Sequence, residues 1–187
     1  MIKKNTIIDN IKTLIFALII AIIIRSLIIQ PFYIPSSSME PNLLIGDRIF
    51  VSKMSYGYSK HSFPFSPPIF KGRFLSDTPK RGDIIVFKTP ADNRTDYIKR
   101  VIGLPGDTIQ FIDGILYVND LEIFKDLKSN NEIIFCGNKT IDVSTFEEKL
   151  SDKKFKTVYS KNYTFQNSQK FVVPDKHYFF LGDNRDC

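Results

Sequence analysis

Residues 13–29 read TLIFALIIAIIIRSLII, and this apolar run decides the architecture of the chain. The run holds one charged residue, Arg25. As an α-helix it would be roughly 26 Å long, slightly short of a hydrocarbon core of about 30 Å. The stems of Lys12 and Arg25 can lie in lipid while their charges reach an interface, which covers the shortfall. The sequence therefore predicts a transmembrane segment at 13–29, preceded by a short segment at 1–12.

The basic residues before this run give the orientation of the segment. Three lysines precede it, against one acidic residue, Asp9. Such an excess of positive charge is typical of a cytoplasmic N-terminus. A cleaved secretory signal would begin in the same way, but no A-x-A-like site follows, and Pro31 and Pro35 come instead. We interpret the run as an uncleaved anchor whose following residues lie across the membrane.

The rest of the chain has the periodicity of β-strands. Short runs rich in β-branched and aromatic residues, bounded by Gly and Pro, lie at 47–55, 83–89, 97–102, 170–173 and 177–181. Residues 111–118 predict a hairpin with Asp113-Gly114 as a type I′ turn. The one candidate for a helix, 142–154, has poor apolar spacing. We therefore expect a mainly β protein, with one transmembrane helix and an all-β ectodomain at 30–187.

An irregular insert at 56–79 (YGYSKHSFPFSPPIFKGRFLSDTP) interrupts the strand pattern. It is crowded with Phe, Tyr, Pro and Ser, and it is too rich in Pro for a core strand. Its aromatic residues could dip into the membrane interface. A loop packed on itself would have the same composition, so both interpretations stay open.

Composition excludes several classes of function. A chain of 187 residues with a net charge of +6 can hold one anchor and one ordinary domain. Its Lys and Arg residues are dispersed, which argues against a nucleic-acid partner and suits a surface with some attraction to lipid headgroups. Two cysteines, Cys136 and Cys187, and two histidines, His61 and His177, provide no zinc-binding pattern. We expect two unpaired thiols, no metal and no cofactor.

The chemistry of the chain centres on a run of three serines, Ser36-Ser37-Ser38, directly after the anchor, and on Lys99 in an apolar strand. A serine hydroxyl is a poor nucleophile until a base removes its proton. Lysine can be that base only when neutral, and at its ordinary pKa roughly one in a few thousand is neutral near pH 7. Burial lowers a Lys pKa. Strand alternation puts Lys99 on the face of Tyr97 and Val101 and points Arg100 the other way, and a Lys base would need Lys99 inward and Arg100 outward.

Neither feature decides the function by itself. The serines could form a polar turn, and a surface Lys on an edge strand would look the same as a buried one. The two histidines offer no better base, because His61 lies in the irregular insert and His177 precedes a buried-looking Tyr-Phe-Phe run.

Four segments together resemble the conserved boxes of type I signal peptidases, in the same order. They are the serine segment at 36–53, the strand at 81–87, the segment DYIKRVIGLPGD at 96–107, and GDNRD at 182–186. This resemblance implies a membrane serine protease with a Ser-Lys dyad, with Ser38 as the nucleophile and Lys99 as the general base. It implies an oxyanion hole formed by the Ser38 backbone N–H and the Ser36 hydroxyl.

The resemblance also implies a substrate. A preprotein signal peptide whose apolar helix ends in the same bilayer would present its cleavage site near Ser38, which lies no more than about 30 Å from the anchor. An extended substrate could pair with a strand edge. The expected substrate-binding residues are those flanking the dyad: Phe32, Ile34, Pro35, Met39, Tyr97 and Ile98.

The chain departs from the family pattern in three places. Asn42 stands where Thr is usual, and Ser37 where Gly is common. The family motif also continues beyond Asp186 with further Ser, Asp and Arg residues and more β-structure, so we expect 30–187 to be an incomplete ectodomain.

The leading interpretation is a signal peptidase I of the bacterial inner membrane, single-pass, with a cytoplasmic N-terminus and a periplasmic catalytic domain. Its partners would be preprotein signal peptides and the lipid bilayer. An alternative is a truncated, catalytically inactive β-domain tethered to the membrane. A self-cleaving Ser-Lys regulator is a third reading, but such proteins are soluble and the anchor argues against it.

Overall fold

Helix α1 runs from Lys4 to Leu27 in the computed structural model, which describes residues 4–63, 66–68, 71–162 and 166–187. Its side chains are exposed from Thr6 to Arg25. Within it, Thr6–Leu27 is long and apolar enough to cross a membrane, with a mean hydropathy of 2.4. A helix that is apolar on all sides has no preferred face against a protein core, which suits a lipid environment.

The bounds of the helix differ from the predicted membrane segment at 13–29. The helix begins nine residues earlier, at Lys4, and β1 (Ile29–Tyr33) begins where the predicted segment ends. Residues 1–3 of the predicted cytoplasmic segment lie outside the described residues. The placement of the segments 1–12, 13–29 and 30–187 about a bilayer stays a prediction.

The chain divides into two compact units, which are described separately. The first unit is Met1–Phe32 with Arg48–Thr78, and the second is Tyr33–Asp47 with Pro79–Cys187. In the first unit the end of α1 is held by later residues. The Tyr58 hydroxyl donates to the Leu27 carbonyl at 2.7 Å, and the Lys53 N–H donates to the Ile28 carbonyl at 3.0 Å. These bonds satisfy carbonyl groups that a helix end leaves without partners.

The first unit also contains β2 (Arg48–Ser52), which pairs with β1, and the short pair β3 (Tyr58–Ser59) and β4 (Arg73–Phe74), with the 3₁₀ turn η2 (Lys60–Ser62) between them. The β3–β4 pair belongs to the irregular insert at 56–79, of which 64–65 and 69–70 lie outside the described residues. Tyr58 and Phe74 stack at 5.3 Å, whereas Leu75 is 80% exposed. Self-packing and exposed apolar surface therefore occur in the same insert.

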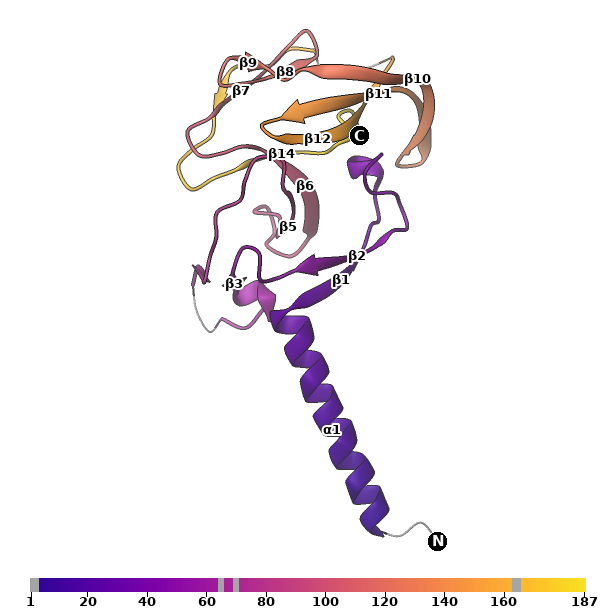
Figure 1. Cartoon of the computed structure of the whole chain (residues 1–187), viewed down its shortest axis with the longest axis vertical. Coiled ribbons are helices and arrows are strands. Elements are labelled where there is room, and N and C mark those ends of the chain that lie inside the picture. The colour runs from indigo at the N-terminus through magenta and orange to yellow at the C-terminus, as the bar shows by residue number, and fades with distance from the viewer. Residues whose placement is uncertain (1–3, 64–65, 69–70, 163–165) are drawn as a thin grey trace. The chain divides into compact units, whose positions relative to one another are not determined.

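The second unit is built from three antiparallel sheets (Figure 1). The first has the order β14-β6-β5, the second β13-β7-β8-β9 and the third β10-β11-β12. Their bounds are β5 Ile84–Lys88, β6 Asp96–Gly103, β7 Thr108–Ile112, β8 Ile115–Val118, β9 Leu121–Glu122, β10 Lys125–Cys136, β11 Lys139–Leu150, β12 Lys153–Ser160, β13 Phe171–Val172 and β14 Phe179–Leu181. The expectation of a mainly β protein with one apolar N-terminal helix is confirmed.

The hairpin predicted at 111–118 is confirmed by the pairing of β7 with β8, in which Ile112 lies opposite Ile115. The turn residues Asp113 and Gly114 have φ values of 48° and 74°. A type I′ turn requires positive φ at both positions, which Asp-Gly tolerates well.

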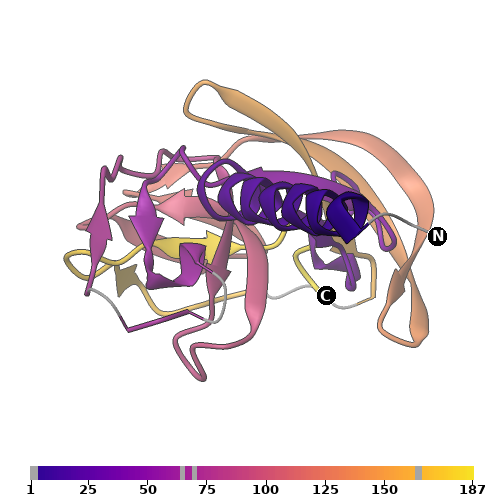
Figure 2. The same cartoon turned by 90° about the horizontal axis from the view of Figure 1, so that it is seen from below.

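The helix considered for 142–154 does not form, because these residues belong mostly to β11, which pairs with both β10 and β12. Register shifts between Leu127 and Glu132 interrupt the β10–β11 ladder, and β10 bends along its length (Figures 1 and 2). Such irregularities bend a strand and increase its twist.

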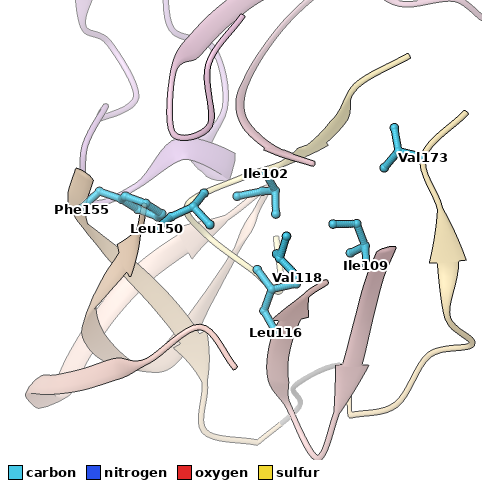
Figure 3. Packing of buried hydrophobic residues seen from close by; sticks show 7 residues of the cluster. All are labelled: Ile102, Ile109, Leu116, Val118, Leu150, Phe155 and Val173. Carbon is cyan, nitrogen blue, oxygen red and sulfur yellow. The ribbon is translucent and has the colours of Figure 1, made fainter. Parts of the chain in front are cut away.

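A core of seven buried apolar residues joins the sheets of the second unit (Figure 3). Its members come from β6, β7, β8, β11 and β12 and from the residue after β13, and their side chains point toward one another: Ile102, Ile109, Leu116, Val118, Leu150, Phe155 and Val173. Ile102 lies three positions after Lys99, so the strand that carries the lysine is anchored in this core.

The expectation of two unpaired thiols is wrong, because Cys136 and Cys187 form a disulfide. Cys136 ends β10, and its partner is 51 positions away in sequence. Pairing at that distance depends on where β10 and the last residues lie in the fold, which composition does not reveal.

We predict that this cross-link contributes substantially to stability. A bond that closes a loop of 51 positions restricts the unfolded chain, and chain entropy alone gives about 4 kcal/mol. Cys136→Ser should lower the free energy of unfolding by about that amount in urea titrations followed by circular dichroism. A dithiol reductant should destabilise the parent chain but not the variant, and equal midpoints for the parent chain with and without reductant would contradict the prediction.

Candidate active site

Lys99 and Ser38 meet in the second unit, although 61 positions separate them in sequence. Lys99 lies in β6, the central strand of its sheet, opposite Ile85 of β5. Ser38 lies in the 3₁₀ turn η1 (Ser37–Met39). The Lys99 Nζ donates a hydrogen bond to the Ser38 Oγ, and both side chains are half-buried. A base and a hydroxyl in direct contact have the geometry that proton transfer requires.

The surroundings of Lys99 lower its pKa. Burial lowers the pKa of Lys99 below its ordinary value of 10.5, and the negative charge of Asp183 opposes this shift. The net direction is downward, because loss of solvation outweighs the attraction of one carboxylate. A larger fraction of Lys99 is therefore neutral near physiological pH than for a lysine in water.

The expectation that Arg100 points outward to solvent is wrong. Arg100 is 6% exposed, and its guanidinium lies 3.9 Å from the centre of the Phe155 ring. Alternation along β6 does separate it from Lys99, but Phe155 of β12 covers Arg100 on the opposite face. The period of a strand indicates which residues share a face and does not indicate whether that face meets water.

Arg100 is instead half of a buried ion pair with Asp183, which is 0% exposed. The Arg100 Nε donates to Asp183 Oδ1 and the Nη2 to Asp183 Oδ2, both at 2.7 Å. Its Nη1 donates to the Gly82 carbonyl at 2.7 Å. This bidentate pair of hydrogen bonds fixes the orientation of the carboxylate and also compensates its charge.

The residues next to Asp183 hold the turn that carries Ser38. The Asn184 N–H donates to the Ser38 carbonyl at 3.2 Å, and the Asn184 Nδ2 donates to the Ser37 carbonyl at 3.2 Å. A Cβ on Gly182 would clash with the Ser38 carbonyl oxygen. The approach of these two segments therefore requires glycine at 182, a role that the sequence motif signalled without revealing its reason.

Ser36, which is predicted to supply one donor of an oxyanion hole, lies beside Ser38. Its Oγ is 3.3 Å from the Ser38 Oγ, and its side chain is exposed. Ser36 occupies the N-cap position of η1, yet its hydroxyl makes no capping hydrogen bond there. The Ser36 hydroxyl therefore lies next to the Ser38 hydroxyl and does not cap the start of the turn.

The predicted substrate-binding residues divide into two groups. Pro35 and Tyr97 are exposed and Ile98 is half-buried, so part of each of these residues is accessible. Ile34 is 2% exposed and Met39 is 0% exposed, so in this structure their side chains belong to the interior. Phe32 belongs to the first unit.

The two histidines make local contacts. The His61 Nδ1 lies 3.1 Å from the Ser66 Oγ, and the His177 Nδ1 lies 2.9 Å from the Asp175 carbonyl oxygen. Over the described part of the chain, no three His, Cys, Asp or Glu residues cluster as they would around a metal ion.

Comparison with known proteins gives a consistent set of relatives. The family model described as "Signal peptidase, peptidase S26" matches residues 7–187. The signal peptidase I of Rickettsia typhi is 42% identical over 181 residues, which cover 91% of this chain and 67% of the relative. That of Rickettsia bellii (strain OSU 85-389) is 43% identical over 185 residues, covering 94% of this chain and 63% of the relative.

Among solved structures, a signal peptidase I from Enterococcus faecalis is 31% identical, with a TM-score of 0.33, covering 58% of this chain and 80% of that chain. The chain spans about two-thirds of the length of its Rickettsia relatives.

Because the Ser38 carbonyl lies so close to Gly182, we predict that a side chain at 182 lowers stability. Gly182→Ala should lower the free energy of unfolding by about 2 to 3 kcal/mol, because the added methyl group forces the Ser38 backbone away from its place. Gly137→Ala is the control, since Gly137 has a positive φ but open space around it, and it should cost only about 1 kcal/mol. Thermal unfolding measures both, and equal losses would contradict the role given to Gly182.

Proposed function

Because the chain belongs to the signal peptidase family, peptidase S26, we propose that it is a membrane-bound serine endopeptidase. Its substrates would be exported preproteins, from which it removes the N-terminal signal peptide. The observation that supports this most directly is the contact of Lys99 Nζ with Ser38 Oγ on a buried strand, where the pKa of Lys99 is lowered.

In the first step, neutral Lys99 takes the proton from the Ser38 hydroxyl while the Oγ attacks the carbonyl carbon of the scissile peptide bond. The carbonyl π electrons move to its oxygen, and Lys99 becomes an ammonium group. The Ser38 backbone N–H and the Ser36 hydroxyl would donate to that oxyanion. Removing one donor of this kind typically costs about 3 to 4 kcal/mol of transition-state stabilisation.

In the second step the C–N bond breaks, and the Lys99 ammonium gives its proton to the departing amine of the mature protein. The signal peptide is then an ester on Ser38. Water attacks this ester with Lys99 as base, which releases the signal peptide carboxylate and restores the Ser38 hydroxyl. The same lysine thus serves as base and acid in both halves of the reaction.

Substrate contacts would come from the residues that the structure leaves accessible around the dyad. Pro35 precedes the serine run and is exposed, and Tyr97 and Ile98 precede Lys99 on β6. We propose that an extended segment of the preprotein lies against these three side chains, with its scissile carbonyl at Ser38.

The apolar helix supports a single-pass anchor. A segment such as Thr6–Leu27 can span a bilayer, and the lysines near its start favour a cytoplasmic N-terminus. The protein would then lie in a bacterial inner membrane with its β-domain on the outer side. Signal peptides end in the same bilayer, so anchoring brings enzyme and substrate together.

We predict that the side chain of Ser38, and not that of its neighbour, carries out the reaction. Ser38→Ala should lower preprotein cleavage by more than about 10⁴-fold, because no other hydroxyl contacts Lys99 in the described structure. Ser37→Ala should be mild, since the Ser37 Oγ contacts the Cys187 Sγ and only its carbonyl is held by Asn184. Comparable losses from the two substitutions, measured on a preprotein in detergent, would refute the assignment.

The role of Lys99 predicts a pH dependence. Below its folded-state pKa, each pH unit raises the neutral fraction of Lys99 about tenfold, so kcat/KM should rise with pH along a limb of unit slope. Since the pKa of Lys99 is lowered, this limb should end below pH 10.5. Lys99→Arg keeps the charge but cannot become neutral, and it should be as inactive as Lys99→Ala. A profile that falls with rising pH would contradict the role of Lys99 as a base.

A further inference from the structure

Asn42 links three parts of the second unit through one amide group. It follows η1 closely, and its N–H donates to the Met39 carbonyl at 3.1 Å. The Asn42 Nδ2 donates to Asp183 Oδ2 and to the Lys156 carbonyl, both at 2.7 Å. Both partners are acceptors only, so the nitrogen of the amide must be the atom that faces them.

Asn42 contacts the carboxylate that acts on Lys99. The Asp183 carboxylate accepts three hydrogen bonds, two from Arg100 and one from Asn42. The charge of Asp183 opposes the effect of burial on the pKa of Lys99. A donor to this carboxylate spreads its negative charge, so it weakens the attraction that keeps the proton on the lysine.

We propose that Asn42 is a positioning residue of the active site, which joins the nucleophile turn to Asp183 and β12 and moderates the charge of Asp183 toward Lys99. This inference rests on the proposed function, because it assigns Asn42 a part in activating Ser38. No contact of Asn42 with a substrate is needed.

Among the charged groups on the elements around Lys99, Asp183 is the carboxylate that acts on the Lys99 pKa. The neighbouring strand β14 and the turn η1 carry no ionisable side chain within their bounds. On β5, Lys88 pairs with Asp96 of β6 at 2.8 Å, and Glu40, next to η1, has its pKa raised by burial. The charged side chains of β12 lie at Lys153, paired with Asp83, Lys154, paired with Glu147, and Lys156.

Asn42→Leu tests the proposal, because it keeps the approximate size and removes the donor. Lys99 can be titrated directly by ¹³C NMR with lysine labelled at Cε, its signal assigned by loss in Lys99→Arg. We expect the apparent pKa of Lys99 to rise by about 0.5, and the acid limb of the kcat/KM profile to move by the same amount. At a fixed pH on that limb, kcat/KM should therefore fall about threefold.

A second variant keeps the proposal testable if Asn42→Leu unfolds. Asn42→Asp removes the donor and places a like charge beside Asp183, so it should raise the Lys99 pKa further than Asn42→Leu does. We expect the Lys99 pKa to be highest in Asn42→Asp, lower in Asn42→Leu and lowest in the parent chain. An unchanged Lys99 pKa in a folded variant, or a higher Lys99 pKa in Asn42→Leu than in Asn42→Asp, would overturn the proposal.

The chain offers a matched control at a second Arg–Asp–Asn set. The Asn119 Nδ2 donates to Asp107 Oδ1 at 2.8 Å, and Asp107 also accepts from Arg81 at 2.6 Å. Asn119→Gly removes that donor and suits the positive φ of 56° at this position. It should lower the melting temperature without moving the Lys99 titration. A shift equal to that of Asn42→Leu would show that the effect is general destabilisation.

The readouts also separate this inference from the proposed function. If the parent chain does not cleave a preprotein, or if Ser38→Ala cleaves one, the proposed function fails. The Lys99 titration is measured without substrate, so it still decides whether Asn42 controls the lysine. If the parent chain cleaves preproteins and both Asn42 variants have the same Lys99 pKa as the parent chain, the role of Asn42 is overturned and the proposed function is not.

Discussion

The buried ion pair of Arg100 with Asp183 is the interaction on which the rest of the candidate site depends. Both side chains are almost fully inaccessible, and removing one would leave a buried charge without compensation, at a cost of about 3 to 5 kcal/mol. The pair joins β6, which carries Lys99, to the segment after β14. That segment runs beside β12, where the Val158 N–H donates to the Asp183 carbonyl and the Arg185 N–H to the Val158 carbonyl. Its neighbours Gly182 and Asn184 then fix the turn that presents Ser38.

The same pair sets a balance around Lys99. Burial makes the ammonium form costly, while Asp183 favours it. A carboxylate without other partners would favour the ammonium form of Lys99 more strongly. Arg100 and Asn42 both donate hydrogen bonds to Asp183, and burial has the larger effect on the pKa of Lys99. In the proposed function, Asp183 would therefore help to position the turn that carries Ser38 and would also act on Lys99, the general base.

Local features of the sequence predicted much of this arrangement. The apolar run, the Asp113-Gly114 turn and the strand periodicity are properties of neighbouring residues, and the family resemblance brought Ser38 and Lys99 together across 61 positions. Burial was less predictable. Arg100 was expected to meet solvent and Met39 to meet a substrate, and both lie in the interior. The Cys136–Cys187 bond and the contacts of Asn42 depend on long-range packing of β10 and β12, which a single sequence does not encode in any local pattern.

Identification of the covalent intermediate tests the proposed pairing of Ser38 with Lys99 most directly. A peptide ester that matches a signal peptide cleavage site can be mixed with the protein in detergent, quenched in acid within milliseconds and mapped by mass spectrometry. If Lys99 activates Ser38, an acyl group should form on Ser38 in the parent chain and should be absent in Lys99→Ala. Acylation of Ser36 or Ser37 instead, or equal acylation of Ser38 without Lys99, would contradict the activation of Ser38 by Lys99.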